Sequence, residues 1–411
     1  MKYGLIGEKL GHSFSKIIHE QLGYDYELCE IASIDLDSFM QKKDFLGINV
    51  TLPYKERVIP YLDFVDENAK KIGAVNAIVN REGKLYGYNT DFYGMRALFA
   101  HAGIDPKGKK AAILGSGGTS KTAEAVLFDL GAAEIIKVSR SGKDGAFTYD
   151  ELKSSQFDTE IIVNTTPVGM FPNVFDSPLE ISCFDKLSGV IDAIYNPLRS
   201  ALVQNTLKKG ISAEGGLYML VAQAILASEI FLDKTYPDGT IEGIYDKIKR
   251  KKDNLVLIGM PASGKSTVGR IVASNLGRKF VDTDELITER IGMSIKDFFE
   301  INGEAEFRNI ESEVIKGLAG ETSLVIATGG GAVLKQENIS ALKHNGSIFF
   351  IDRPLDKLIP TEDRPLSNDR ESIEKRYNER YSIYCSSCDV KICADCEAEA
   401  VSDKILENYL K

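Results

Sequence analysis

A glycine-rich loop at residues 259–266 constrains this chain more than any other stretch. It reads GMPASGKS and matches the pattern G-x-x-x-x-G-K-[ST] at every fixed position. The apolar run 255–258 precedes the loop, and a helix is predicted to begin at Ser266. Glycines let successive backbone N–H groups of such a loop point into one concavity, which holds phosphate groups. The chain is therefore expected to contain an α/β domain that binds a nucleoside triphosphate.

Each fixed position of the loop has a predicted role. Gly259 and Gly264 shape the backbone. Lys265 reaches the β- and γ-phosphates, and Ser266 ligates Mg²⁺. Thr267, in the first helical turn, is also assigned to the nucleotide site. The alternative is an ordinary glycine-rich turn between a strand and a helix, which the Lys–Ser pair and both flanks disfavour.

The loop belongs to the second of two predicted parts. A length of 411 residues favours two or three domains, and the polar run KRKKDN at 249–254 marks the expected join. Residues 249–253 are predicted to be a solvated linker between a first part, residues 1–248, and a second part, residues 254–411. Both parts are long enough to bury a core of their own.

Charge and apolar patterning argue against several classes of protein. The net charge of −10 and the pI near 5.2 disfavour nucleic acid as the main partner. The longest nearly apolar run, 217–227, is too short to span a bilayer and contains Gln223. The amino terminus has no apolar segment typical of an export signal, so a cytoplasmic location is expected.

Four of the six cysteines form the pattern CxxC-x₄-CxxC, at Cys385, Cys388, Cys393 and Cys396. A zinc site is one interpretation of this pattern. The gap between the two pairs is much shorter than in a zinc ribbon, and residues 389–392 within it are predicted to be a strand. Reduced thiols in a reducing compartment are the favoured interpretation.

Polar stretches punctuate the first hundred residues at the ends of apolar runs. Taken singly, Ser13 and Ser15 read as turn or cap residues and Lys55 as a solvated lysine. Taken together, in this order and at this spacing, the stretches strongly resemble shikimate dehydrogenase. Lys9 and Lys16 depart from that family, where prolines are common. The stretches are GEKLGHSFS (7–15), INVTLPYK (48–55), GAVNAIV (73–79) and GYNTDFYG (87–94).

The resemblance implies a substrate site and a catalytic pair, Lys55 with Asp91. Hydride transfer to a ketone builds negative charge on its oxygen, so a lysine that donates a proton lowers the barrier. A carboxylate beside the lysine orients it. Gln223, taken alone, is equally a buried polar group of an apolar helix. The implied shikimate ligands are Ser13, Ser15, Thr51, Asn76, Asp91 and Gln223.

Residues 109–138 predict the opening of a dinucleotide-binding fold. Its glycine turn contains Gly115, Gly117 and Gly118 and departs from G-x-G-x-x-G at residue 120. Where an NAD enzyme places an acid for the ribose, this chain has Ser139 and Arg140. A guanidinium with neighbouring hydroxyls suits the 2′-phosphate of NADP. The alternative for Arg140 is an ordinary surface arginine.

The resemblance to shikimate dehydrogenase extends over residues 1–248. It implies that Tyr195 and Gly216 also belong to the cofactor site, near the nicotinamide. In that family the last helix returns to the first domain. The expected substrate domain is therefore 1–100 with 216–248, and the expected NADP-binding domain is 101–215.

The second part carries further acidic and basic residues after the loop. Asp282 and Asp284 close a predicted strand, where one carboxylate can hold Mg²⁺ and the other can accept a hydroxyl proton. We assign the metal to Asp282 and the proton to Asp284. Arg308, Arg364 and Arg380 taken alone are surface ion-pair residues.

The motifs DTD, GEAEFRNIE, ATGGG, DRPL and RYSIY stand in the order found in shikimate kinase, which residues 254–411 resemble. By that resemblance Arg308 and Arg380 hold the substrate carboxylate. Asp284 and Gly330 hold its ring hydroxyls, and Arg364 contacts the transferring phosphoryl group. The lid expected at 354–366 is shorter and more acidic than in the family.

These observations predict an N-terminal α/β substrate domain with a Rossmann-like NADP-binding domain, followed by a P-loop α/β domain of the nucleoside monophosphate kinase type. The expected activity is reduction of 3-dehydroshikimate by NADPH, then phosphorylation of shikimate with ATP and Mg²⁺. One alternative is a quinate/shikimate dehydrogenase that oxidises with NAD, which Arg140 disfavours. Another is that one half senses a nucleotide without turnover, which the presence of Lys55 and Lys265 disfavours.

Overall fold

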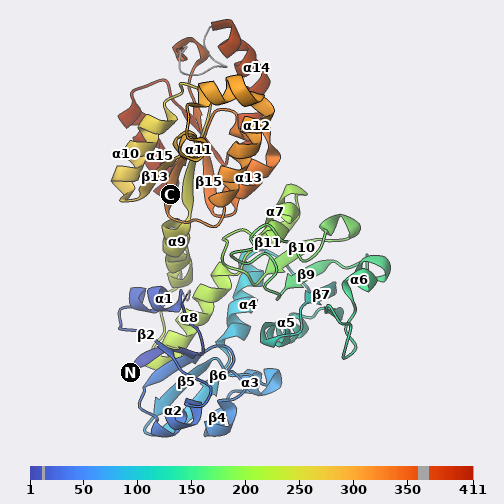
Figure 1. Ribbon diagram of the computed structural model, residues 1–411. Helices are drawn as coiled ribbons and strands as arrows, with labels where there is room; N and C mark the ends of the chain where they lie inside the picture. The colour runs from blue at the N-terminus through green and yellow to red at the C-terminus, as the bar shows by residue number, and fades with distance from the viewer. Residues whose placement is uncertain (12–13, 360–369, 411) are drawn as a thin grey trace. The chain divides into compact units, whose positions relative to one another are not determined.

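A computed structural model describes residues 1–11, 14–359 and 370–410. The chain divides into two compact units. The first contains Met1–Met170, Asp176–Asn196 and Leu202–Lys249, and the second contains Phe171–Phe175, Pro197–Ala201 and Arg250–Lys411. The predicted α/β fold class is confirmed, because helices cover largely parallel sheets in both units (Figure 1). None of the helices in the described part of the chain combines the length and apolar character that a membrane crossing requires.

The first sheet of the first unit is mixed, with strand order β2-β1-β3-β5-β6-β4. β1 pairs in parallel with β2 and β3, and β5 pairs antiparallel with β3 and β6. The strands are β1 (Tyr3–Gly7), β2 (Glu27–Glu30), β3 (Gly47–Val50), β4 (Phe64–Val65), β5 (Ala77–Arg81) and β6 (Lys84–Tyr88). The helices are α1 (Ser15–Gln21), α2 (Leu36–Lys42), η1 (Ile59–Tyr61), α3 (Glu67–Ile72), α4 (Thr90–His101), α8 (Leu217–Leu232) and α9 (Thr240–Lys252).

Helices α4 and α8 lie directly against each other. A Cβ at Gly94 of α4 would lie 2.7 Å from the backbone oxygen of Met219 in α8, so only glycine permits this approach. The late helix α8 thus packs on the early part of the chain, and it carries Gln223 toward the end of α4 that holds Asp91.

The second sheet of the first unit is parallel, with strand order β11-β10-β9-β7-β8. Its strands are β7 (Lys110–Leu114), β8 (Glu134–Val138), β9 (Ile161–Asn164), β10 (Gly189–Asp192) and β11 (Ser212–Glu214). Its helices are α5 (Gly118–Asp129), α6 (Tyr149–Ser155), η2 (Ile181–Cys183) and α7 (Ala201–Lys208). Parallel strands bring their carboxyl ends to one edge, where α/β proteins bind ligands.

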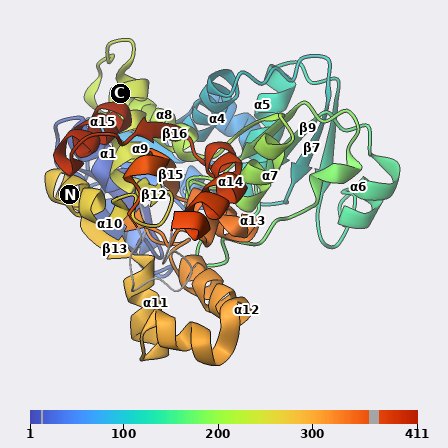
Figure 2. The ribbon, with the colours of Figure 1, turned by 90° about the horizontal axis from the view of Figure 1, so that it is seen from above.

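The sheet of the second unit is also parallel, with strand order β13-β14-β12-β15-β16. Its strands are β12 (Asn254–Ile258), β13 (Lys279–Asp282), β14 (Leu324–Ala327), β15 (Gly346–Asp352) and β16 (Val390–Cys393). Its helices are α10 (Lys265–Leu276), α11 (Thr283–Ile291), α12 (Ile295–Gly317), η3 (Ala332–Leu334), α13 (Gln336–Lys343), η4 (Leu355–Lys357), α14 (Arg370–Ser387) and α15 (Ala398–Leu410). Figure 2 shows α11 and α12 next to each other.

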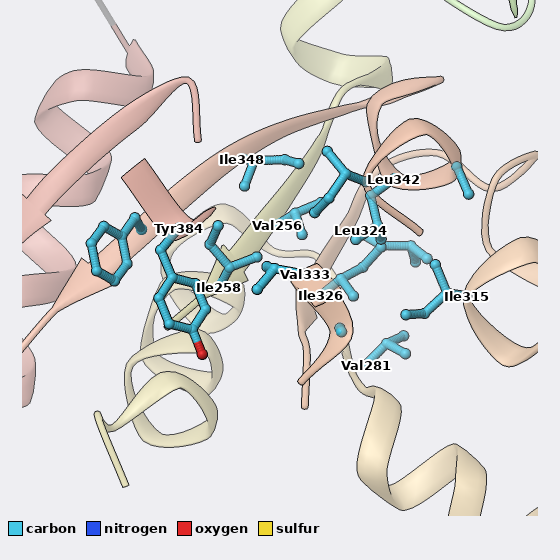
Figure 3. Packing of buried hydrophobic residues seen from close by; sticks show 14 of the residues in the cluster. Val256, Ile258, Val281, Ile315, Leu324, Ile326, Val333, Leu342, Ile348 and Tyr384 are labelled. Atoms are coloured by element: carbon cyan, nitrogen blue, oxygen red, sulfur yellow. The ribbon is translucent and has the colours of Figure 1, made fainter. Parts of the chain in front are cut away.

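Alternate residues of the central strand β12 serve two cores. Leu255 and Leu257 join the cluster beneath α10 and α15. Val256 and Ile258 point to the opposite face and join the larger cluster, which Figure 3 shows with Ile348 and other side chains. Successive strand side chains point to opposite faces, so a continuous apolar run is what a strand covered on both sides requires.

The prediction about the segment that connects the two parts is modified by the structure. Residues 249–252 are the last turn of helix α9, not an irregular tether. Ile244, Tyr245 and Ile248 give α9 a buried face, and lysines in the last turn suit the negative end of a helix.

Strand β16 separates the two cysteine pairs. Cys385 and Cys388 precede the strand, whereas Cys393 ends it and Cys396 follows it. Because a strand advances about 3.3 Å per residue, the four sulfurs cannot converge on one tetrahedral ion. This geometry disfavours the zinc interpretation.

Candidate active sites

The first site is a cavity of about 430 Å³ in the first unit. It lies near the carboxyl ends of β1 and β3, where α4 and α8 also reach it. Ser13 falls outside the described residues. The cavity brings together the other predicted substrate and catalytic side chains, Ser15, Thr51, Lys55, Asn76, Asp91 and Gln223, and also Tyr195.

Lys55 and Asp91 form the closest charged pair in this cavity. Lys55 Nζ donates to Asp91 Oδ2 at 2.6 Å, and both side chains are largely shielded from solvent. Asp91 lies in the first turn of α4, whose start is fixed because the Asn89 side chain accepts a hydrogen bond from Phe92 N. Asp91, placed at the capped start of this helix, therefore holds the Lys55 ammonium at the cavity.

A buried network holds the amide side chains of the same cavity. Asn76 Oδ1 accepts from the backbone N of Thr90 at 2.7 Å, and Asn76 Nδ2 donates to Thr90 Oγ1 at 3.0 Å. Thr90 Oγ1 also lies 3.3 Å from Gln223 Oε1. The Thr90 hydroxyl thus links the two predicted substrate ligands.

Sequence reasoning missed Thr90 and also Asn49, which lines the cavity. Asn49 Oδ1 accepts from the Tyr26 hydroxyl at 2.7 Å, and Asn49 Nδ2 donates to the carbonyl of Asn76 at 3.2 Å. Both missed residues lie inside stretches already singled out, INVTLPYK and GYNTDFYG. A polar residue within an apolar strand was the available signal.

The second site is a cavity of about 540 Å³ at the carboxyl edge of the parallel sheet of the first unit. Gly115 has φ +112°, and a Cβ there would lie 2.7 Å from Thr165 Oγ1, so the turn requires glycine. Gly118 begins α5, which directs its positive end toward the turn. Predicted cofactor residues that line the cavity are Gly115, Gly117, Ser139 and Arg140.

Three predicted cofactor residues, Gly118, Tyr195 and Gly216, are not among the residues that line this cavity. Tyr195 lines the substrate cavity instead, where its ring packs 5.2 Å from that of Phe14, and burial raises the pKa of its hydroxyl. A Cβ at Gly216 would lie 2.2 Å from the oxygen of Ala193, so its evident local role is close backbone packing. Tyr149 lines the cavity and was not predicted.

The third site surrounds the glycine-rich loop of the second unit. Gly264 has φ +91° and precedes α10, which begins at Lys265, one residue before the predicted start. Lys265 is 6% exposed, and its Nζ donates to the carbonyls of Gly259 and Met260 at 3.0 and 2.8 Å. The loop therefore folds around the ammonium as a phosphate-binding loop does.

The predicted magnesium ligands lie together beside this loop. Ser266 Oγ donates to Asp282 Oδ2 at 2.6 Å. The other oxygen, Asp282 Oδ1, accepts from the backbone N of Asp284 at 2.9 Å and caps α11. A hydroxyl and a carboxylate at this spacing fit the oxygen preference of Mg²⁺.

An arginine-rich cluster adjoins Asp284. Arg308 pairs with Glu311 at 2.8 Å and with Glu304 at 3.0 Å. A Cβ at Gly331 would lie 2.2 Å from Arg308, and Arg380 donates to the carbonyl of Gly330 at 3.2 Å. The structure thus places Arg308, Gly330 and Arg380 in one cluster.

Glu311 is a residue of this cluster that sequence reasoning quoted but did not assign. Its side chain is 1% exposed, and Oε1 has no hydrogen-bond partner among the described residues. Burial raises the pKa of Glu311, nearby Arg308 opposes this, and Asp284 adds to it. Burial lowers the pKa of Arg308, but Glu311 and Glu304 raise it by more. Arg364 falls outside the described residues, as does the lid from residue 360 onward.

Comparisons with known proteins cover both units. The family model of the shikimate dehydrogenase substrate binding domain matches residues 5–78, and that of shikimate kinase matches residues 261–410. The shikimate dehydrogenase (NADP(+)) of Clostridium beijerinckii is 38% identical over 261 residues, which cover 59% of this chain and 96% of that protein.

Solved structures resemble the first unit. A crystal structure of shikimate dehydrogenase 1 from Peptoclostridium difficile is 40% identical, with a TM-score of 0.55, and covers 60% of this chain and 98% of that one. The Thermus thermophilus shikimate 5-dehydrogenase in complex with NADP(H) and shikimate is 28% identical, with a TM-score of 0.54, and covers 60% of this chain and 99% of that one.

Proposed function

We propose, since this chain belongs to the shikimate dehydrogenase family and carries a shikimate kinase domain behind it, that its two activities run in sequence. The dehydrogenase works in the reductive direction and converts 3-dehydroshikimate to shikimate with NADPH. The kinase then transfers the γ-phosphoryl group of ATP to the 3-hydroxyl of shikimate. The product of the first reaction is the substrate of the second.

The Lys55–Asp91 pair carries this proposal for the reductase. Bound NADPH supplies a hydride to the carbonyl carbon. Lys55 donates a proton to the carbonyl oxygen as negative charge develops there, and Asp91 at 2.6 Å keeps the ammonium aimed. Asn76 and Gln223, joined through Thr90, bind ring hydroxyls.

In the kinase, the phosphate loop binds the nucleotide and the arginine cluster binds shikimate. Ser266 and Asp282 would hold Mg²⁺, which neutralises phosphate charge when bound, and Lys265 contacts the terminal phosphates. Asp284 accepts the proton of the attacking hydroxyl. Arg308 and Arg380 hold the carboxylate of shikimate, a use for which guanidinium groups are well matched.

A coupled assay tests the sequence of reactions. The full chain is supplied with 3-dehydroshikimate, NADPH, ATP and Mg²⁺, while NADPH loss and ADP release are followed together. We expect ADP release to lag and then to match NADPH consumption. ADP release without dependence on shikimate, or a reductase that works only as an NAD-linked oxidase, would contradict the proposal.

A further inference from the structure

Tyr149 stands at the end of the cofactor cavity that holds Arg140. The cavity runs from the glycine turn Gly115–Gly117 and the end of β9 to the segment after β8. In folds of this class the adenosine half of a dinucleotide lies over the end of the second strand, which here is β8. Both Arg140 and Tyr149 line that end of the cavity.

Backbone contacts fix the position of Tyr149. After β8 the chain loops out and returns, and Ser139 N donates to the carbonyl of Phe147 at 2.9 Å while Phe147 N donates to that of Lys137 at 2.8 Å. Thr148 then caps α6 through a reciprocal capping box with Glu151. Tyr149 is the first residue of α6, so its backbone lies between a strand-like bridge and a capped helix.

The surroundings of the ring leave it partly in the cavity. Tyr149 is half-buried and packs against the apolar cluster that contains Val138 and Leu152. Burial raises the pKa of its hydroxyl, and the nearby Arg140 guanidinium opposes that rise. At this end of the cavity the aromatic ring offers a flat face on which a planar base can stack, and the guanidinium offers a cation for a phosphate group.

We propose that Tyr149 stacks on the adenine of the dinucleotide, while Arg140 reads the 2′-phosphate. This inference rests on the proposed function, because it assumes that the cavity binds NADP. Stacking uses the face of the ring and does not require the hydroxyl. Adenine is common to NADPH and NADH, so Tyr149 should strengthen the binding of both cofactors. Arg140 should strengthen the binding of NADPH alone, because only NADPH carries the 2′-phosphate.

Binding measurements on the full chain separate these roles. Dissociation constants are measured for NADPH, NADH and ADP-ribose with Tyr149→Ala, Tyr149→Phe and Arg140→Ala. We expect Tyr149→Ala to weaken all three ligands by a similar factor, roughly 5- to 100-fold, the range for loss of one base–aromatic stack. Tyr149→Phe should stay within about twofold of the parent chain, since stacking on the ring face is retained.

The matched control is Phe147→Leu, because Phe147 packs against the same cluster and is not among the residues that line the cavity. The dissociation constants of the Phe147→Leu variant for NADPH, NADH and ADP-ribose should equal those of the parent chain. Unchanged binding in Tyr149→Ala, or a loss confined to NADPH, overturns the inference. A loss of equal size in Phe147→Leu also overturns it, because it shows a general effect of the cluster. Failure of the parent chain to bind NADPH would instead refute the proposed function.

Discussion

Arg140 follows β8 and lines the cofactor cavity beside Ser139. A charge-assisted hydrogen bond from its guanidinium to a 2′-phosphate is worth about 1.5–3 kcal/mol. We therefore expect Arg140→Ala to lose about that much binding free energy with NADPH and little with NADH. Steady-state kinetics with each cofactor provide the measurement. Equal losses with both would show that Arg140 does not read the phosphate.

His19 is a buried residue whose surroundings should make the stability of the fold depend on pH. It is buried in α1, stacks on Tyr26 with ring centroids 4.0 Å apart, and its Nδ1 is hydrogen-bonded to the Tyr24 hydroxyl. Nε2 has no hydrogen-bond partner among the described residues. Burial lowers the pKa of His19 from 6.5 to about 3.

The sign of the pH effect follows from this shift. Below pH 6.5 the unfolded chain binds a proton at His19 and the folded chain does not, so stability falls as the pH falls toward 3. At pH 5 the loss from this group is about 2 kcal/mol. His19→Phe, which keeps an aromatic ring in the stack, should reduce the difference between urea midpoints at pH 7 and pH 5. An unchanged difference would contradict the assignment.

At the scale of elements, the contact of α4 with α8 sets the distance between the catalytic pair and Gln223. A methyl group at Gly94 would lie 2.7 Å from Met219 O and 2.9 Å from Gln223 Cβ. Gly94→Ala should therefore separate the helices, cost about 1–3 kcal/mol of stability, and lower reductase turnover. Kinase turnover with free shikimate should not change.

Gly243→Ala is the matched control for this prediction. Gly243 lies in α9, and a Cβ there meets no atom within 4 Å. Alanine removes the conformational freedom of glycine in a helix, so we expect a neutral to slightly stabilising effect, up to about 1 kcal/mol. Thermal unfolding of both variants gives the comparison. Equal destabilisation in the two would refute the close-approach argument.

Elements differ in how far the sequence could predict them. The phosphate loop and the Ser266–Asp282 pair were predictable, because a glycine pattern and a strand end are local signals. The roles of Thr90, Glu311 and Tyr149 depend on neighbours brought by distant elements, which a local pattern does not contain. The run 249–252 contains only polar residues, so by itself it predicts a solvated linker. The apolar residues that make it part of a helix, Ile244, Tyr245 and Ile248, lie in the preceding turns.

At the scale of the whole molecule, the two sets of site residues fall in different units. We predict that Lys55→Ala abolishes only the reductase and Lys265→Ala only the kinase, each assayed in the full chain. Proximity can raise the local concentration of shikimate without a tunnel. Loss of kinase turnover in a folded Lys55→Ala protein supplied with free shikimate would contradict this prediction.

We also predict that fragments 1–250 and 251–411 fold alone, but with unequal stability. The second unit includes Val174, which is buried in its larger core, and Arg199, whose backbone N donates to the carbonyl of His344 at 2.9 Å. Fragment 251–411 lacks both. The urea midpoint for unfolding of this fragment should therefore lie below the midpoint at which the second unit unfolds in the full chain. The fragment should still phosphorylate shikimate without residues 171–201.

The place of β12 in its sheet has a consequence for how the phosphate loop survives local fluctuations. β12 is paired on both sides, with β14 and β15, whereas β16 is an edge strand. Amide protons of Leu255–Ile258 should therefore exchange with deuterium only when the whole sheet opens, while those of β16 exchange through fraying of the edge. The phosphate loop thus follows the central strand of the sheet, and opening of the edge strand β16 leaves the pairing of that strand intact.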